Sequence, residues 1–215
     1  MNRQILILLI FVPTMLFAQK TKKVTDELTN EVFYVLKSDK KIRHGEYKML
    51  DFKGKLLVSG YYKYGVKDSI WEYYNGKEQL IAKYDYTKDE LIFCKPNLQK
   101  DKKYKIIVNE NRLDTTLSRP PIFLGGDGLI SSKVIYPISA MQNGKSGRVV
   151  VSFTVDKFGK TSNYHVNTPL GYGLDEEVIR VLKSLSDFWL PGLLDGQPVD
   201  VETEYSFNFK FAGVF

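Results

Sequence analysis

The amino-acid sequence predicts an α+β protein in two parts: an all-β meander, then a C-terminal domain in which a three-stranded antiparallel sheet packs with helices. Three observations predict this class. The chain has 215 residues, more than one small domain needs. Hydrophobic residues make up 43% of it against 26% charged, which is typical of a folded chain. Short alternating segments fill the first half, and the second half adds segments with a helical period.

The N-terminus has the features of a secretory signal peptide. Arg3 gives a positive start, and an apolar run over residues 5–17 follows it. At about 1.5 Å per residue this run spans roughly 20 Å, which is short of the roughly 30 Å hydrocarbon core of a bilayer. We therefore predict an exported chain whose signal peptide, residues 1–18, is cleaved after Ala18. An uncleaved anchor in the inner membrane is the alternative.

The net charge of +6 belongs to the first half of the chain. Residues 19–117 hold 21 basic and 15 acidic residues, whereas residues 118–215 hold 9 and 10. Basic residues interleaved with tyrosines, as in Tyr61-Tyr62-Lys63-Tyr64, are typical of single-stranded nucleic-acid binding. Because an exported chain does not meet nucleic acid, we expect no such partner and retain an anionic envelope surface instead.

Cys94 is the only cysteine, so the chain cannot form an internal disulfide. It follows the apolar residues 91–93, which favours a buried structural thiol over a reactive or intermolecular one. We expect Cys94 to pack as a small apolar side chain.

Residues 31–93 alternate apolar and polar side chains in short runs separated by turn residues, which predicts a β-meander. Residues 54–62 and 76–86 are alike, and their spacing of about 22 to 24 residues indicates repeated hairpins. The hairpins resemble MORN-type repeats through the motifs Gly45-Glu46-Tyr47, Gly60-Tyr61-Tyr62, Trp71-Glu72-Tyr73-Tyr74 and Gly76-Lys77. This resemblance implies an interaction or spacer module over residues 19–95. We expect its aromatic side chains to fill the hairpin core rather than to grip a ligand.

A charged stretch that contains proline marks the boundary between the two parts. We assign residues 96–118 to a linker, in which the alternation at residues 104–108 predicts one extra strand. Ser118-Arg119-Pro120-Pro121 forms a second break, and the C-terminal domain extends from there over residues 119–215.

The C-terminal domain begins with a short helix. Tyr136-Pro137 starts it and Asn143-Gly144 ends it, because proline suits the first turn and glycine suits the C-cap. The next predicted elements are a strand over 148–156, a turn, a strand over 161–168, a helix from about Leu174, and a last strand over 199–211.

The last strand alternates with unusual regularity. One of its faces carries Val199, Val201, Thr203, Tyr205, Phe207, Phe209 and Phe211. The other face carries the acidic residues Asp200, Glu202 and Glu204, which would discourage indiscriminate strand pairing.

This order of elements resembles the C-terminal domain of the TonB energy transducer over about 95 residues. The motifs that carry the likeness include Phe123-Leu124-Gly125-Gly126, Gly147-Arg148-Val149, Trp189-Leu190-Pro191-Gly192 and Asp195-Gly196-Gln197-Pro198. The family-motif positions are Tyr136, Pro137, Gly147, Asp156, Gly159, Leu174, Asp175, Pro191, Gly192, Gly196 and Pro198.

The resemblance implies a protein-binding module in the periplasm or at the outer membrane. In this family the domain captures an extended segment of an outer-membrane receptor beside its last strand, in the service of TonB-dependent transport. The same mode is physically sound here, because an edge strand offers unpaired N–H and C=O groups. The partner-binding positions implied on this strand edge are Val199, Val201, Thr203, Tyr205 and Phe207.

Two features differ from a complete transducer. Residues 5–17 contain neither His nor Ser, and no proline-rich spacer follows them. We therefore expect the domain to keep recognition without energy transduction. The alternative is a structural envelope adaptor, whose basic β module binds an anionic surface and whose TonB-like domain forms a homodimer.

The sequence predicts no enzyme activity, no metal site and no cofactor. His44 and His165 are the only histidines and lie in different parts, which favours neither a nucleophilic triad nor a metal site. Asp175-Glu176-Glu177 suits a helix N-terminus without any chemistry. Gly125-Gly126-Asp127-Gly128 lacks the lysine and flanking strand of a phosphate loop, so we predict a turn there.

Overall fold

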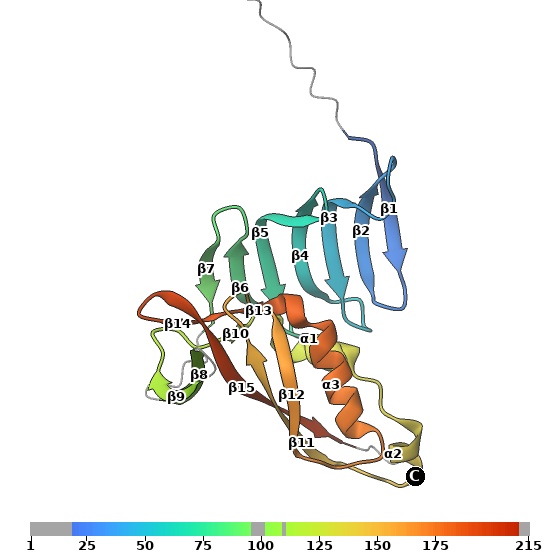
Figure 1. Ribbon diagram of the computed structural model, residues 1–215. Helices are drawn as coiled ribbons and strands as arrows, with labels where there is room; N and C mark the ends of the chain where they lie inside the picture. Colours follow the sequence, from blue (N-terminus) through green and yellow to red (C-terminus); the bar gives the residue numbers. More distant parts are fainter. Residues whose placement is uncertain (1–18, 96–101, 109–110, 211–215) are drawn as a thin grey trace, which may run out of the picture.

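A computed structural model describes residues 19–95, 102–108 and 111–210, which form two large β-sheets and a two-stranded one, with the helices in the C-terminal part (Figure 1). The predicted signal peptide at residues 1–18 and the predicted end of the last strand at Phe211 lie outside the described residues. None of the described helices has the length and apolar character needed to cross a membrane.

The first sheet is a seven-stranded antiparallel meander, in which each strand pairs with the next one along the chain. Its strands are β1 (Thr21–Asp26), β2 (Glu31–Leu36), β3 (Arg43–Leu50), β4 (Leu56–Lys63), β5 (Val66–Tyr74), β6 (Leu80–Asp85) and β7 (Glu90–Cys94). The predicted meander is confirmed, and it starts one strand earlier than the alternating pattern indicated.

The core of this meander is aromatic, as the repeats predict. Trp71 stacks on Tyr47 with ring centroids 5.2 Å apart, and Tyr62 meets Trp71 edge-on at 5.0 Å. A Cβ atom built at Gly60 would lie only 2.2 Å from the indole of Trp71. The glycine therefore makes room for the tryptophan of the neighbouring strand, and the rings fill the module's own interior.

The second sheet has the strand order β12-β11-β15-β8-β9, and β14 pairs with β15 outside this path. Its strands are β8 (Lys103–Val108), β9 (Asn111–Thr116), β11 (Gly147–Val155), β12 (Thr161–Thr168), β14 (Gly192–Leu194) and β15 (Gln197–Phe209). The three predicted strands are present as β11, β12 and β15, but the expectation of a three-stranded sheet is wrong. The segment assigned to a linker supplies a hairpin, β8–β9, that extends the sheet.

β8 joins this sheet because its side chains match those of β15. Ile106 is buried and pairs with Val201, and the Lys105 ammonium lies 3.7 Å from the Glu202 carboxylate. The local alternation does predict a strand here. It cannot show which strand becomes the neighbour, because that depends on residues far along the chain.

The described helices are α1 (Gly126–Lys133), α2 (Ile138–Gln142), α3 (Leu174–Ser184) and the 3-10 turn η1 (Ser186–Phe188). Two short strands, β10 (Ile122–Phe123) and β13 (Trp189–Leu190), pair with each other. α2 and α3 confirm the two predicted helices. α3 covers β11 and β12, and its buried residues Val178, Val181 and Leu182 lie at helical spacing (Figure 1).

The turn predicted at Gly125-Gly126-Asp127-Gly128 is wrong in part, because only Gly125 lies in a turn and α1 begins at Gly126. Glycine disfavours a helix, but here close packing requires it. A Cβ at Gly125 would lie 2.2 Å from the side chain of Leu129, and one at Gly128 would lie 2.9 Å from the backbone nitrogen of Gly76. Burial of Leu129 and Ile130 stabilises the helix despite its low intrinsic propensity.

The two parts share one apolar core rather than hanging on a free linker. Tyr73 of the meander meets Phe188 edge-on at 6.1 Å. The Lys133 ammonium on α1 donates to the carbonyl oxygen of Thr29 at 3.3 Å and lies 3.8 Å from the Glu31 carboxylate. These contacts fix the C-terminal domain against the face and one end of the meander.

Candidate functional site at the edge of β15

β15 is the central strand of the candidate site. It pairs with β11 over nine consecutive positions, from Val201 opposite Val155 to Phe209 opposite Gly147, without a register shift. On its other side β8 pairs only with Asp200, Val201 and Glu202. Within the described residues, the stretch 203–209 therefore has a strand neighbour on one side alone.

The five predicted partner-binding residues fall into two groups. Val201 is fully buried between Val155 and Ile106, so it does not lie on an open edge, which corrects that prediction. Val199 pairs with Gly192 of β14. Thr203, Tyr205 and Phe207 lie on the stretch that pairs with β11 alone. The prediction missed this division because it did not expect β8 to occupy part of the edge.

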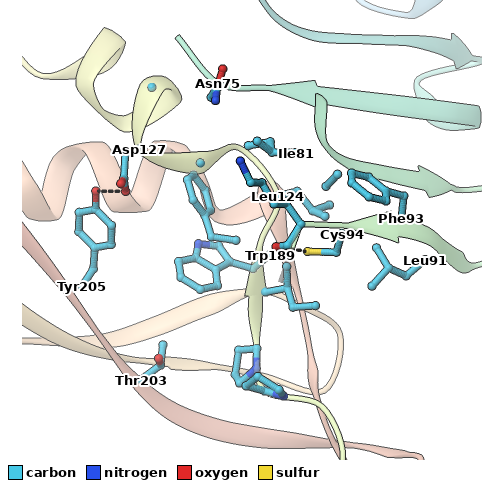
Figure 2. Close-up of a pocket in the computed structure, with 18 of the residues that line it drawn as sticks. Asn75, Ile81, Leu91, Phe93, Cys94, Leu124, Asp127, Trp189, Thr203 and Tyr205 are labelled. Atoms are coloured by element: carbon cyan, nitrogen blue, oxygen red, sulfur yellow. Dashed lines mark hydrogen bonds between the residues drawn. The ribbon is translucent and has the colours of Figure 1, made fainter. Parts of the chain in front are cut away.

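The open stretch borders a cavity of about 1190 Å³ between the two parts of the molecule (Figure 2). Thr203, Glu204 and Tyr205 line one side of it. The opposite side comes from the end of the meander, including Ile81 and the β7 residues 91–94. The cavity thus brings an unpaired strand edge together with apolar side chains that are distant in sequence.

Tyr205 and Trp189 shape the floor of this cleft (Figure 2). The Tyr205 hydroxyl donates to Asp127 of α1 at 3.1 Å, and burial together with this carboxylate raises the pKa of Tyr205. Trp189 packs against Phe123 at 5.0 Å and Phe153 at 5.2 Å. Its indole Nε1 is buried and has no hydrogen-bond acceptor within the part of the chain that the structure describes.

Arg119 reaches the same cleft from the break that precedes β10. Its backbone pairs with Leu193 in both directions, and its Nη2 donates to the carbonyl oxygen of Pro191 at 3.0 Å. Its Nε is buried without an acceptor, and no described carboxylate lies within 4.0 Å of it. Burial lowers the pKa of this guanidinium, yet arginine keeps its charge at any physiological pH.

Cys94 also lines the cleft, half-buried rather than fully buried as predicted. Its thiol donates weakly to the carbonyl oxygen of Lys95 at 3.6 Å. Burial raises the pKa of the thiol, which disfavours the reactive thiolate. This environment agrees with a structural thiol.

A second cavity, of about 820 Å³, lies beside Lys67 at the other side of the junction. The Lys67 ammonium donates to the carbonyl oxygen of Asp187 at 2.9 Å and to the Tyr86 hydroxyl at 3.2 Å. It also lies within 5 Å of the ring centroids of Trp71, Tyr86 and Phe188. Burial lowers its pKa to about 8. Lys67 therefore joins the two parts and does not belong to an exposed basic surface.

Several family-motif residues hold turns and helix ends. Pro137 precedes α2, and Asp175 accepts hydrogen bonds from the amides of Leu170 and Gly171 at 2.8 Å each. Asp156 accepts from the amides of Phe158 and Lys160 in the β11–β12 turn. Tyr136 donates to the carbonyl oxygen of Lys145 and packs on Phe209.

The remaining motif residues provide close packing or a left-handed backbone. Gly159 has φ 77° and lies against the carbonyl oxygen of Trp189, and Gly192 lies against Val201. Leu174 is fully buried. Gly147, Gly196, Pro191 and Pro198 occupy strand ends and the turn between β14 and β15. None of these single positions lines the larger cleft, so they shape the domain; of the longer motifs, Phe123, Leu124, Gly126 and Trp189 do line it.

The histidines and acidic residues of the described ranges do not gather into a group that could hold a metal ion. No group of three or more His, Cys, Asp or Glu side chains there lies close enough together to hold a metal ion. His44 accepts a hydrogen bond from the amide of Tyr64 at 3.2 Å, and His165 is exposed on β12.

Comparison with known proteins supports the resemblance for the C-terminal part. Residues 132–211 match the family model described as Gram-negative bacterial TonB protein C-terminal. The NMR solution structure of the Helicobacter pylori TonB C-terminal domain is similar over 40% of this chain and 88% of that chain, with 25% sequence identity and a TM-score of 0.32. No curated protein matches the chain. The matched segment includes β11, β12, α3 and β15, whereas the meander and the β8–β9 hairpin lie outside it, and the MORN resemblance stays a prediction.

Proposed function

We propose that this chain is a non-enzymatic cell-envelope protein that binds a protein partner by adding an extended segment of that partner to β15 at residues 203–207. The observation that carries this proposal is the open side of β15, where a regular strand borders the larger cleft. Unpaired backbone groups on such an edge supply affinity, and neighbouring pockets supply side-chain preference. The similarity of residues 132–211 to TonB C-terminal domains agrees with this use.

Other edges of the same sheet are poorer candidates. β12 pairs with β11 through two register shifts, and such irregularities twist an edge away from further pairing. β9 is short, and most of its side chains are exposed, so an added strand would find little apolar surface. The open stretch of β15 combines a regular backbone with the apolar walls of the cleft.

The proposal extends to location and partner. The chain works in the periplasm or at the outer membrane, and its partner is an outer-membrane receptor or an extended segment of one. It recognises that partner without transmitting energy from the inner membrane. The signal peptide that this requires remains the prediction made from residues 1–18.

Site-specific photo-cross-linking tests the proposal. p-Benzoylphenylalanine is placed at Glu204, which is exposed on the open stretch, and at His165, which is exposed on the opposite edge strand, as a matched control. We expect irradiated cells to give an adduct between position 204 and an extended segment of an envelope receptor, identified by mass spectrometry, and none at position 165.

Other outcomes separate the alternatives. Adducts of equal yield at both positions, or none at position 204, would contradict strand addition at β15. An adduct that joins two copies of this chain through position 204 would favour the homodimeric adaptor.

A further inference from the structure

The larger cleft is lined by more cationic than acidic side chains, although Asp89 also acts electrostatically on Arg119. Four cationic residues line it: Lys77, Lys95, Lys102 and Arg119. None of them has a described carboxylate within 4.0 Å. The cleft therefore offers its positive charge to something outside the described chain.

The two carboxylates that line the cleft already have protein donors. Asp127 accepts from the Tyr205 hydroxyl at 3.1 Å, and Glu204 accepts from the Asn167 amide at 2.8 Å. Glu202, on the half of β15 outside the cleft, differs from them because it lies 3.7 Å from both Lys105 and Arg112. Neither carboxylate of the cleft has such a described cationic partner within 4.0 Å.

A second, independent observation points to the same place. In the described chain, three buried side-chain polar atoms have no hydrogen-bond partner, and two of these belong to lining residues of this cleft, Arg119 Nε and Trp189 Nε1. Both atoms can only donate. A buried donor without an acceptor is unfavourable, so a small rearrangement that admits an acceptor here is favoured.

Resting on the proposed function, we propose that the segment added to β15 is acidic and that one of its carboxylates pairs with Arg119, with Lys95 and Lys102 beside it. The occupant is an extended polypeptide in which apolar and acidic residues alternate. Its apolar side chains meet Ile92, Phe93 and Phe123, its backbone pairs with the open stretch of β15, and its carboxylates meet the cations. A bidentate pair between a carboxylate and a guanidinium adds orientation as well as affinity.

Three octapeptides with the same label test this proposal. One alternates valine with glutamate, the second valine with glutamine and the third valine with lysine, and fluorescence anisotropy measures their binding to the chain from residue 19 onward. We expect the glutamate peptide to bind about tenfold more tightly than the glutamine peptide, and the lysine peptide to bind most weakly. Added salt should reduce the advantage of the glutamate peptide.

Substitutions show which residues cause the preference for the glutamate peptide over the glutamine peptide. Arg119→Gln should remove most of the preference for glutamate over glutamine, whereas Arg112→Gln, an arginine on β9 that does not line the cleft, should leave it unchanged. If Arg119→Gln lowers the melting temperature so far that binding cannot be measured, the double substitution Lys95→Gln and Lys102→Gln replaces it and should halve the preference or more.

Each outcome decides between the two proposals. Equal binding of the glutamate and glutamine peptides overturns the acidic preference and leaves strand addition standing. A preference that survives both Arg119→Gln and the double substitution also overturns the assignment. Dextran sulfate that competes at the same ionic strength without the Arg119 dependence would show a general anionic surface and overturn the peptide assignment. The cross-linking at position 204 reports on strand addition separately.

Discussion

The two halves of β15 differ in their neighbours, although the strand itself is continuous. Glu202 pairs with Thr154 of β11 on one side and with Lys105 of β8 on the other. Glu204 pairs with Ser152 of β11 alone among the described residues. Since the register with β11 is the same in both halves, the open edge is created by the point at which β8 stops pairing. Whether a stretch of strand has an open edge therefore depends on where its neighbour stops pairing, and not on the sequence of the stretch itself.

Two cations at the junction of the two parts, Lys67 and Arg119, also differ in the number of partners that the protein supplies to them. Lys67 has a carbonyl oxygen, a hydroxyl and three aromatic rings around its ammonium. Arg119 has one carbonyl oxygen and a buried Nε without an acceptor. The contacts of Lys67 therefore join the two parts of the fold, whereas Arg119 keeps a donor that the described residues do not use.

The largest expected effect is a loss of stability on substitution in the half of β15 that pairs with both β11 and β8. Val201→Asp buries a carboxylate between β11 and β8, where the side chain is fully buried, and should lower the free energy of unfolding by about 3 kcal/mol or more. Thr203→Asp, two residues along the same face on the open half, is the matched control and should cost about 1 kcal/mol. Urea denaturation followed by circular dichroism measures both, and equal losses would mean that the two halves do not differ.

Proline substitutions at two successive positions should separate stability from binding. Along a strand, successive N–H groups point to opposite sides, so only one of Thr203→Pro and Glu204→Pro removes a donor from the β11 ladder. That variant should lose about 3 kcal/mol of stability. The other variant should remain nearly as stable as the unmodified chain but bind the glutamate octapeptide at least about tenfold more weakly. If both variants are stable and both bind normally, β15 does not accept an added strand.

The spacing of apolar residues along the chain predicted those strands and helices that bury one apolar face against the core. The alternation of Val149, Val151 and Phe153 predicts β11, and the helical spacing of Val178, Val181 and Leu182 predicts α3. These residues pack against a core that any partner element could provide, so short-range periodicity suffices.

What the sequence could not predict depends on which distant residues meet. Ile106 indicates a strand, but its pairing with Val201 closes half of the candidate edge. Lys67 is one of the basic residues of the first half, and no local pattern shows that its partner Asp187 lies 120 residues away. Arg119 stands in a proline-containing break, so no periodic signal distinguishes it. The TonB resemblance indicated β15 as the candidate strand, and the tertiary structure restricts the proposed site to residues 203–207.

The stability of the protein should depend on pH through Lys67, which lies at the junction of the two parts. Because burial lowers its pKa from 10.5 to about 8, the unfolded chain holds this proton more tightly than the folded chain does. The stability of the unmodified chain should therefore rise, relative to Lys67→Met, as pH increases from about 8 toward 9.5, and the comparison cancels the titration of the tyrosines that both proteins share. We expect a relative rise of about 1–2 kcal/mol, allowing for partial solvent screening. Parallel pH profiles of the two proteins would show that Lys67 is not buried at the junction.

The smallest expected effect concerns the ion pairs that accompany the closure of β15 by β8. Glu202 lies 3.7 Å from both Lys105 and Arg112, and these two cations are largely exposed. Exposed pairs contribute little, so Glu202→Gln should lower the free energy of unfolding by about 0.5 kcal/mol at low salt and by less at 1 M NaCl. A loss as large as that of Val201→Asp would mean that charge rather than apolar pairing holds β8 in place. In that case high salt should release the β8–β9 hairpin from β15 and lengthen the open edge. The glutamate octapeptide would then protect the amides of residues 200–202 from hydrogen exchange, in addition to those of residues 203–207.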